Sequence, residues 1–248
     1  MLRSLVGRPT FSLSRLGRRL GAPISRVASG TDAAALAAVV EARADVVCLA
    51  GYPWVLPPEV FQRPRLGAIN LHASLLPRHR GILPLFWIYY HDDRDTGVTV
   101  HRVAETADSG PILGQARFAL PRGFAVDRLN SFNAERGGVL MASTLDALER
   151  GVAHEHPQDE SLATPAPRVA QGARMVDFEH WGAERVWHFL AGLFPWFQEP
   201  LVDGTGKTLR YRGVAGFSIS QHDRRPGRIE RVGSRLTLYC RDGIVELW

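Results

Sequence analysis

The first half of the chain alternates between two kinds of hydrophobic pattern. Short apolar runs, such as 46–50, are typical of buried strands, whereas 127–150 repeats apolar residues at helical spacing. Glycine- and proline-containing turns separate the segments. The pattern predicts strands over 46–50, 68–72, 98–103 and 112–120, and helices over 11–20, 33–42 and 127–150. Strands that alternate with helices indicate an α/β fold with a largely parallel sheet.

The pattern changes after residue 153. Residues 154–174 contain several prolines and mixed charges and are predicted to form a linker. An aromatic-rich segment over 183–193 then has helical spacing. Short apolar runs separated by glycines follow, at 209–211, 228–232, 236–240 and 244–248. They predict a small β-barrel or curled sheet, so we expect one domain over 1–153 and a second over 175–248.

Composition narrows the class of protein. The 248 residues are 45% hydrophobic and 22% charged, which is ordinary for a globular chain with a buried core. No apolar run approaches the roughly 18 residues that span a bilayer, so no membrane partner is expected. Cys48 and Cys240 lie in apolar runs, which favours buried free thiols in a reducing, cytoplasmic compartment over a disulfide.

Arginine supplies almost all of the positive charge behind the net charge of +5, since Lys207 is the only lysine among 30 basic residues. The arginines are scattered, so charge alone is weak support for a nucleic-acid partner. Residues 1–31 carry arginines and serines but no acid, a composition also found in mitochondrial transit peptides. We favour instead a helix over 11–20 that Gly21 and Pro23 end.

Residues 69–114 hold the densest group of candidate catalytic side chains. Side chains two apart on a strand share a face, so Asn70 and His72 project together from the end of the second strand. Asp108 follows the next strand in a turn with serine and glycine and is expected to reach the same point. Ligands of α/β proteins bind at such strand ends.

These three residue types suit acyl transfer to an amine. The Asn70 amide can donate to the oxyanion that forms as the carbonyl carbon becomes tetrahedral. The His72 imidazole can hold that oxyanion or carry a proton between the amine and the leaving nitrogen. The Asp108 carboxylate raises the pKa of the imidazole and accepts the proton that the amine loses. Taken singly, each residue is more often a turn, cap or structural residue.

Two other chemistries have less support. A hydrolase built on Ser74, His72 and Asp108 lacks the glycine-flanked elbow that exposes a serine nucleophile, and Ser74 favours a turn. His154 and His156 lie two apart in the predicted linker, so no metal site is expected there.

Together the motifs resemble the signature of the folate-dependent formyltransferases, which act on glycinamide ribonucleotide, methionyl-tRNA or amino sugars. The segments that carry the resemblance are 70–77, Arg80-Gly81, Pro84, Trp87, 96–99 and 108–111. The resemblance implies a Rossmann-like catalytic domain over 1–153, an OB-like domain over 175–248, and 10-formyltetrahydrofolate as co-substrate. The family's catalytic Asn, His and later Asp correspond here to Asn70, His72 and Asp108.

The resemblance also assigns binding residues. The loop over 51–56 resembles the pterin-binding segment of the family. The folate is therefore expected to contact Trp54, Val55, Leu56, Glu105, Thr106 and Ala107. The amine substrate is expected to contact Ser74, Arg80, Gly81 and Trp87.

The amine acceptor stays open at this point. Trp87 resembles the amino-sugar branch, which favours a nucleotide-linked amino sugar. The C-terminal domain and the positive charge make methionyl-tRNA the alternative, and glycinamide ribonucleotide ranks third. Family members begin with a strand and a helix that this chain is expected to lack, so a non-catalytic protein that binds folate or a partner is a further hypothesis. No oligomeric state is predicted.

Overall fold

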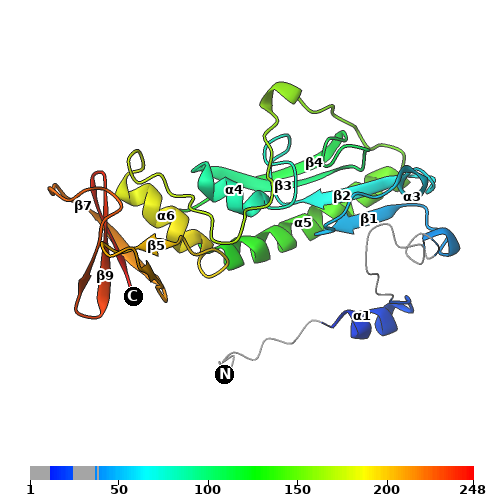
Figure 1. Cartoon of the computed structure of the whole chain (residues 1–248). Coiled ribbons are helices and arrows are strands. Elements are labelled where there is room, and N and C mark those ends of the chain that lie inside the picture. The colour runs from blue at the N-terminus through cyan, green and yellow to red at the C-terminus, as the bar shows by residue number, and fades with distance from the viewer. Residues whose placement is uncertain (1–11, 25–36, 38) are drawn as a thin grey trace.

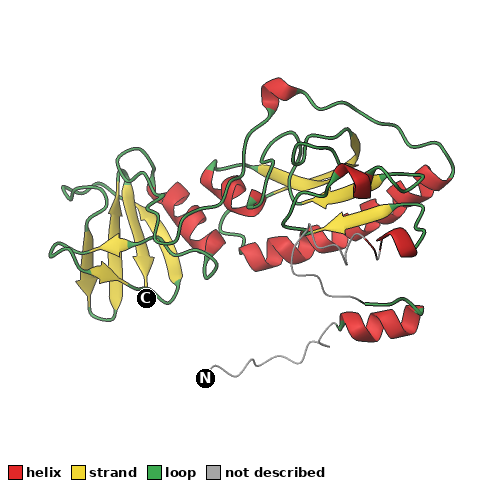
Figure 2. Ribbon diagram, turned by 45° about the vertical axis from the view of Figure 1, so that its right-hand side comes forward, coloured by secondary structure: helices red, strands yellow, loops and turns green. Residues whose placement is uncertain are grey.

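The computed structural model describes residues 12–24, 37 and 39–248, so half of the predicted helix over 33–42 falls outside the described residues. Near the N-terminus, helix α1 spans Leu13–Leu20. The Ser12 hydroxyl accepts a hydrogen bond from the Arg15 N–H, and Gly21 ends the helix in the left-handed conformation at φ 64°. Both ribbon views place α1 apart from the sheet (Figure 1, Figure 2).

Four strands form the sheet of the larger unit. They are β1 (Val47–Ala50), β2 (Ala68–His72), β3 (Asp95–Arg102) and β4 (Ile112–Ala119), in the spatial order β1-β2-β3-β4. β1 and β2 are parallel, whereas β2–β3 and β3–β4 are antiparallel. The α/β class is confirmed, but the described sheet is mixed rather than largely parallel. The short connection 103–111 contributes to the difference, because a parallel pair needs a crossover of about a dozen residues or more.

Helices cover one face of this sheet and flank its edge. They are α3 (Pro58–Phe61), α4 (Pro84–Tyr90) and α5 (Val126–Glu149). The long α5 runs beneath the sheet (Figure 1) and buries apolar side chains of β2 and β3. Gly137 allows this close approach, because a Cβ there would lie 2.5 Å from Cδ2 of Leu71. Since β2 alternates, its other face carries Asn70 and His72.

Residues 150–182 connect the larger unit to the C-terminal unit. They contain a short 3-10 helix, η1 (Glu160–Leu162). Isolated bridges pair Arg80 with Pro165 and Ile112 with His156. The predicted linker over 154–174 is therefore fixed to the larger unit along part of its length. Within the described residues, no helix is both long enough and apolar enough to cross a membrane.

The C-terminal unit consists of one helix and short strands. Its elements are α6 (Ala183–Leu193), β5 (Leu201–Val202), β6 (Thr208–Leu209), β7 (Val214–Ile219), β8 (Ile229–Val232), β9 (Arg235–Cys240) and β10 (Gly243–Leu247). Four strands form an antiparallel sheet in the order β7-β10-β9-β8, and β5 pairs with β6. The small C-terminal β domain is confirmed. The sequence pattern does not predict β7, because Gly216 and Ser218 interrupt its apolar run.

The two units share one hydrophobic core. Helices α4 and α6 pack together, with the rings of Phe86 and Phe189 5.6 Å apart in an edge-to-face arrangement. Tyr89 is fully buried against Gly192, where a Cβ would lie 2.1 Å from Cε1 of Tyr89. Apolar side chains of β9 and β10 continue the same cluster. One core therefore spans both predicted domains, and the domain boundaries stay a prediction.

Candidate active site

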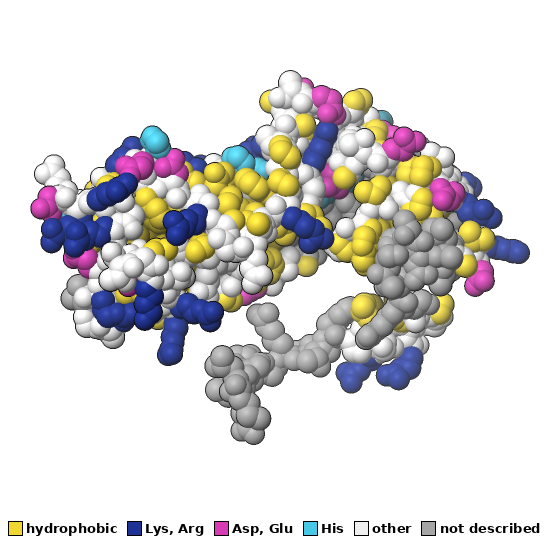
Figure 3. Space-filling model, viewed as in Figure 1, with side chains coloured by type: hydrophobic (Ala, Val, Ile, Leu, Met, Phe, Trp, Pro, Cys, Tyr) yellow, Lys and Arg dark blue, Asp and Glu magenta, His cyan; other side chains and the backbone are white. Residues whose placement is uncertain are grey.

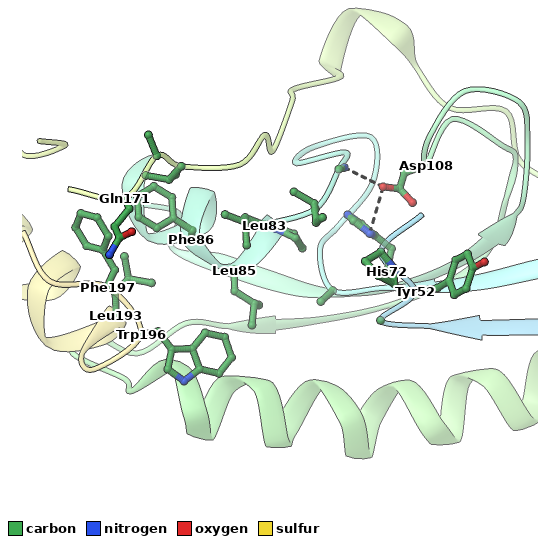
Figure 4. A pocket seen from close by; sticks show the side chains of 18 of the residues that line it. Tyr52, His72, Leu83, Leu85, Phe86, Asp108, Gln171, Leu193, Trp196 and Phe197 are labelled. Carbon is green, nitrogen blue, oxygen red and sulfur yellow. Dashed lines mark hydrogen bonds and ion pairs between the residues drawn. The ribbon is translucent and has the colours of Figure 1, made fainter. Parts of the chain in front are cut away.

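The end of strand β2 brings the three predicted catalytic residues together. Asn70 and His72 lie on β2, and Asp108 reaches them from the loop after β3 (Figure 4). The Asn70 Nδ2 donates to Asp108 Oδ1 at 3.3 Å, and His72 Nδ1 lies 3.5 Å from Asp108 Oδ2. Asp108 has a φ of 54°, a left-handed conformation that aspartate and asparagine adopt more readily than most residues. The catalytic roles of the three residues stay predictions.

The partners of His72 determine which of its nitrogens carries the hydrogen. Its Nε2 lies 2.8 Å from the backbone oxygen of His79, and a carbonyl oxygen only accepts, so Nε2 is the donor. In the neutral ring Nδ1 then holds the lone pair and faces Asp108. Burial lowers the pKa of His72, although the Asp108 charge opposes the shift. His72 is therefore neutral at neutral pH and able to take up a proton at Nδ1.

Asp108 is ionised despite its partial burial. Burial alone would raise its pKa, but a hydrogen bond from protonated His101, the positive charges that His72 and His101 carry when protonated, and the Gly81 N–H outweigh burial and lower the pKa. The Gly81 N–H donates to Oδ2 at 2.8 Å. The loop that follows β2 thus supplies a donor that holds the carboxylate as an anion beside His72.

A second histidine lies beside this group and is absent from the predicted site. His101 on β3 is 2% exposed and stands opposite Asn70 in the antiparallel register. Its Nδ1 donates to the backbone oxygen of Arg102 at 2.7 Å, so Nε2 holds the lone pair in the neutral ring. Nε2 lies 3.1 Å from Asn70 Nδ2 and 3.4 Å from Asp108 Oδ1. The alternation of side chains along β3 indicates that His101 points to the same face of the sheet as the candidate site. It does not reveal that His101 pairs with Asn70 across the two strands.

Both hydrogens of the Asn70 amide are directed at protein acceptors. One meets His101 Nε2 and the other meets Asp108 Oδ1. Among the described residues, no donor bonds to the Asn70 Oδ1. An oxyanion therefore has to compete for an N–H of Asn70, whereas Oδ1 is available to accept a hydrogen from an amine.

Two adjoining cavities meet at this group. The larger has a volume of about 610 Å³ and the smaller about 140 Å³. The residues that line both are Tyr52, Pro53, Asn70, Gly81, Ile82 and Asp108. From there the larger cavity extends past Leu83 and Phe86 to Leu193, Trp196 and Phe197 (Figure 4). In the part of the chain that the structure describes, no group of three or more His, Cys, Asp or Glu side chains is placed to hold a metal ion.

Half of the residues predicted to bind folate line the smaller cavity. These are Trp54, Val55 and Ala107. Leu56 is buried in an apolar cluster instead, and the exposed Glu105 and Thr106 lie outside the lining of both cavities. Tyr52 and Pro53, from the same predicted loop over 51–56, also line the smaller cavity, as do Leu49, Val103 and Ala104, which the motif did not indicate. That folate binds here stays a prediction.

Of the four residues predicted to contact the amine, Gly81 alone lines the cavities. The Ser74 hydroxyl is fully buried and donates to a backbone oxygen of its own turn at 2.7 Å. The Trp87 Nε1 donates to the backbone oxygen of Pro167 at 2.9 Å. These bonds hold the fold together. Direct contact of Ser74, Trp87 and Arg80 with the substrate stays a prediction, which their placement outside the lining of the cavities does not favour.

Arg80 holds the connecting segment against the loops that follow β2 and β3. Its guanidinium donates to Gln158 Oε1 at 2.8 and 3.1 Å and to the Glu160 carboxylate at 2.8 Å. The Gln158 amide in turn donates to the backbone oxygens of Asp108 and Gly110 at 2.8 and 2.7 Å. Arg80 is therefore a positioning residue that acts on Asp108 through Gln158.

Replacing Arg80 by alanine is expected to lower the free energy of unfolding by about 1–2 kcal/mol, because Gln158 loses its charge-assisted hydrogen bonds. The ion pair with the exposed Glu160 adds little. We expect kcat to fall more than the KM for the amine rises. Chemical denaturation and steady-state kinetics measure both effects, with the exposed Arg150→Ala as control. A large rise in KM at unchanged stability would show that Arg80 contacts substrate after all.

Comparison with known proteins identifies the family to which the chain belongs. Residues 14–144 match the formyl transferase family. A methionyl-tRNA formyltransferase from Halalkalibacterium halodurans is 33% identical over 165 residues, which are 66% of this chain and 52% of that protein. One from Chlorobium limicola is 32% identical over 234 residues, which are 92% of this chain and 72% of that protein. The chain thus spans about half the length of the first relative and more of the second.

A solved structure extends the similarity across both units. WlaRD, a sugar 3N-formyl transferase determined in the presence of dTDP and 5-N-formyl-THF, matches with a TM-score of 0.67. The match covers 95% of this chain and 80% of that protein at 14% sequence identity. At this identity the likeness concerns the fold alone.

Proposed function

Because this chain belongs to the formyl transferase family, we propose that it transfers a formyl group from 10-formyltetrahydrofolate to a primary amine. The observation that carries the proposal is an amide, a neutral imidazole and an ionised carboxylate that meet where two cavities adjoin. In this reaction the amine nitrogen bonds to the formyl carbon, and the bond from that carbon to N10 of the folate breaks. One proton leaves the amine and one reaches the folate nitrogen, so the site needs a proton carrier.

The smaller cavity fits a flat heterocycle such as the pterin head group. The rings of Tyr52 and Trp54 lie 5.4 Å apart at its wall, in an edge-to-face arrangement. Val103, Ala104 and Ala107, from the loop that carries the catalytic carboxylate, form another part of the wall. A folate held there supplies the formyl group at the point where the two cavities adjoin.

We assign the proton transfer to His72. Its Nδ1 holds the lone pair and takes the proton that the amine loses, directly or by way of the Asp108 carboxylate. Asp108 stabilises the imidazolium that results, which then returns the proton to the leaving nitrogen. The Asn70 Oδ1 accepts a hydrogen bond from the amine and orients it. One N–H of Asn70 leaves its present acceptor, His101 or Asp108, and donates to the oxyanion instead.

The lining of the larger cavity bears on the identity of the amine. Beyond the catalytic group its walls include Phe86, Leu193 and Phe197, and the polar Gln171 and Gln198 are uncharged. No lysine or arginine is among the described residues that line it. A nucleotide-linked amino sugar brings a diphosphate, which proteins usually bind with cationic side chains or helix N-termini. We therefore place an amine with an apolar substituent, such as a methionyl ester, ahead of the amino sugar.

An aminoacyl-tRNA also fits the charge of the C-terminal unit. Basic residues outnumber acidic ones over 201–248, and Lys and Arg side chains spread over this unit (Figure 3). Its exposed arginines are Arg210, Arg212, Arg224, Arg225, Arg228, Arg231, Arg235 and Arg241. Such a surface binds phosphate backbones without reading sequence. The apolar cavity thus suits the methionyl group of methionyl-tRNA, and the basic C-terminal unit suits the phosphate backbone of the same molecule.

An assay of the full chain with 10-formyltetrahydrofolate and a panel of amines tests the proposal. We expect formylation of methionyl-tRNA with a kcat/KM about a hundredfold above that of a nucleotide-linked 4-amino sugar. The rate with tRNA is expected to fall as salt rises, because arginine contacts with phosphate are screened. Preference for the amino sugar would reverse the order of acceptors. Folate binding without product from any amine would overturn formyl transfer and favour a binding protein.

A further inference from the structure

The far end of the larger cavity lies between two segments from different parts of the chain. Residues 169–172 of the connecting segment form one wall, and residues 196–198, which follow α6, form the other (Figure 4). Trp196 is fixed, because its Nε1 donates to Asp127 on α5 at 2.7 Å. The 169–172 wall has no regular secondary structure, so its position depends on the contacts of neighbouring residues.

One buried carboxylate joins the two walls. Glu199 directly follows the 196–198 wall and is 2% exposed. Its Oε1 and Oε2 accept hydrogen bonds from the Met175 N–H at 3.1 and 3.0 Å, and Oε2 also accepts from the Val176 N–H at 3.3 Å. Both donors lie shortly after the 169–172 wall. A single side chain therefore ties the residues just after one wall to the residue just after the other.

The surroundings of Glu199 hold it rigidly but do not neutralise its charge. Its own N–H donates to the hydroxyl oxygen of the buried Tyr211 at 3.1 Å. Arg174 on the connecting segment and Tyr211 are the ionisable groups that act on it, and Arg174 does so without a direct ion pair. A buried carboxylate is costly unless donors surround it, so the two backbone N–H groups are essential partners.

The strength of this tie changes with pH. Burial raises the pKa of Glu199 to about 7, although the two backbone N–H donors and Arg174 oppose the shift. Above about pH 7 both oxygens accept hydrogen bonds, whereas below it one oxygen carries a hydrogen and accepts poorly. Burial also raises the pKa of Tyr211, which stays neutral throughout. The tie is therefore strongest on the alkaline side of neutrality.

We propose that Glu199 is a positioning residue that fixes the far wall of the larger cavity and thereby sets the affinity for the amine substrate. The inference rests on the proposed function, because it places the substituent of the amine at that end of the cavity. Glu199 lines neither cavity and acts through the 169–172 wall, so it affects binding and not the transfer of the formyl group.

Glu199→Gln tests this inference in the full chain. The amide keeps the size of the side chain but replaces one oxygen by a donor, which then faces the N–H groups of Met175 and Val176. We expect these two amide protons to exchange about tenfold faster, while protection over α5 is unchanged. With methionyl-tRNA we expect KM for the amine to rise about tenfold and kcat to stay within about threefold of wild type.

The pH dependence supplies a second readout. Below about pH 7 the wild-type KM for the amine is expected to rise more steeply than protonation of the amine itself accounts for, because Glu199 takes up a proton. In Glu199→Gln only the rise due to the amine is expected. Glu246→Gln is the matched control, because Glu246 lies at the surface of the same unit and pairs with Arg235. It is expected to change neither KM nor the exchange of Met175 and Val176.

Three results would count against these proposals in different ways. Unchanged exchange at Met175 and Val176 in Glu199→Gln would overturn the tie itself. Faster exchange with an unchanged KM would overturn its effect on the cavity. If the wild type formylates no amine, the proposed function fails, whereas the exchange result still decides whether Glu199 ties the two walls.

Discussion

Replacement of His72 by alanine is expected to lower kcat for formyl transfer by about 10²–10⁴-fold, the usual contribution of a general acid–base group. The rate falls because the variant lacks the Nδ1 atom that carries the lone pair and accepts the proton, 3.5 Å from the Asp108 carboxylate. Binding of tetrahydrofolate is expected to stay close to wild type, since His72 does not line the smaller cavity. Single-turnover kinetics and equilibrium binding measure the two effects separately.

Two controls make the His72 result specific. His154→Ala removes an exposed imidazole from the connecting segment and is expected to change neither quantity. Added imidazole is expected to restore part of the rate of His72→Ala, because a small base can enter the space that the side chain leaves. Near-normal turnover would remove His72 from the mechanism. A joint loss of turnover and folate binding would indicate a damaged site instead.

The second large effect is expected for Asp108→Asn. Asparagine keeps the shape of the side chain and tolerates the φ of 54° at this position, so the loop is preserved while the charge is lost. We expect kcat/KM to fall about 10²–10³-fold, because the imidazolium of His72 loses its counter-charge and one of two donors, the Asn70 amide or the Gly81 N–H, loses its acceptor. Steady-state kinetics measure the loss, with Asp223→Asn as an exposed control.

The same variant is expected to move the pH–rate profile in one direction. Burial lowers the pKa of His72, and the negative charge of Asp108 opposes that shift. Without the charge the pKa of His72 falls further, so the imidazole stays neutral to lower pH. The acid limb of the profile, which reports protonation of His72, therefore moves to lower pH. A shift to higher pH would mean that another group controls this limb.

The proximity of Asn70, His72 and Asp108 is predictable from the sequence because it depends mainly on residues that are close together in the chain. Once 68–72 is a strand, the two-residue spacing puts Asn70 and His72 on one face. His101 is different, because its place depends on the register between β2 and β3, which joins residues 31 apart. Periodicity identifies a strand but contains no information about its partner or its pairing direction. The mixed sheet escaped prediction for the same reason.

Residues whose partners are distant in the sequence were the hardest to assign. Arg80 and Trp87 belong to the motif that carries the family resemblance, yet both bond to the connecting segment, 78–80 residues away. A motif shows that a residue type belongs at a position, but not whether it contacts a substrate or the fold. Glu199 has no motif at all, and its burial and its two backbone partners emerge only from tertiary packing.

The core that α4 shares with α6 limits how acceptor specificity can be exchanged between relatives. Tyr89 fits against Gly192, and Phe86 packs against Phe189, while Phe86 also lines the larger cavity. In a chimera whose two parts join in the connecting segment, the side chains of α6 from one relative would pack against α4 of another, which would distort both the core and the cavity wall. The unit to transfer is therefore α4 and α6 together with the C-terminal sheet. A graft of the C-terminal unit alone would transfer its basic surface without the cavity wall that α4 contributes.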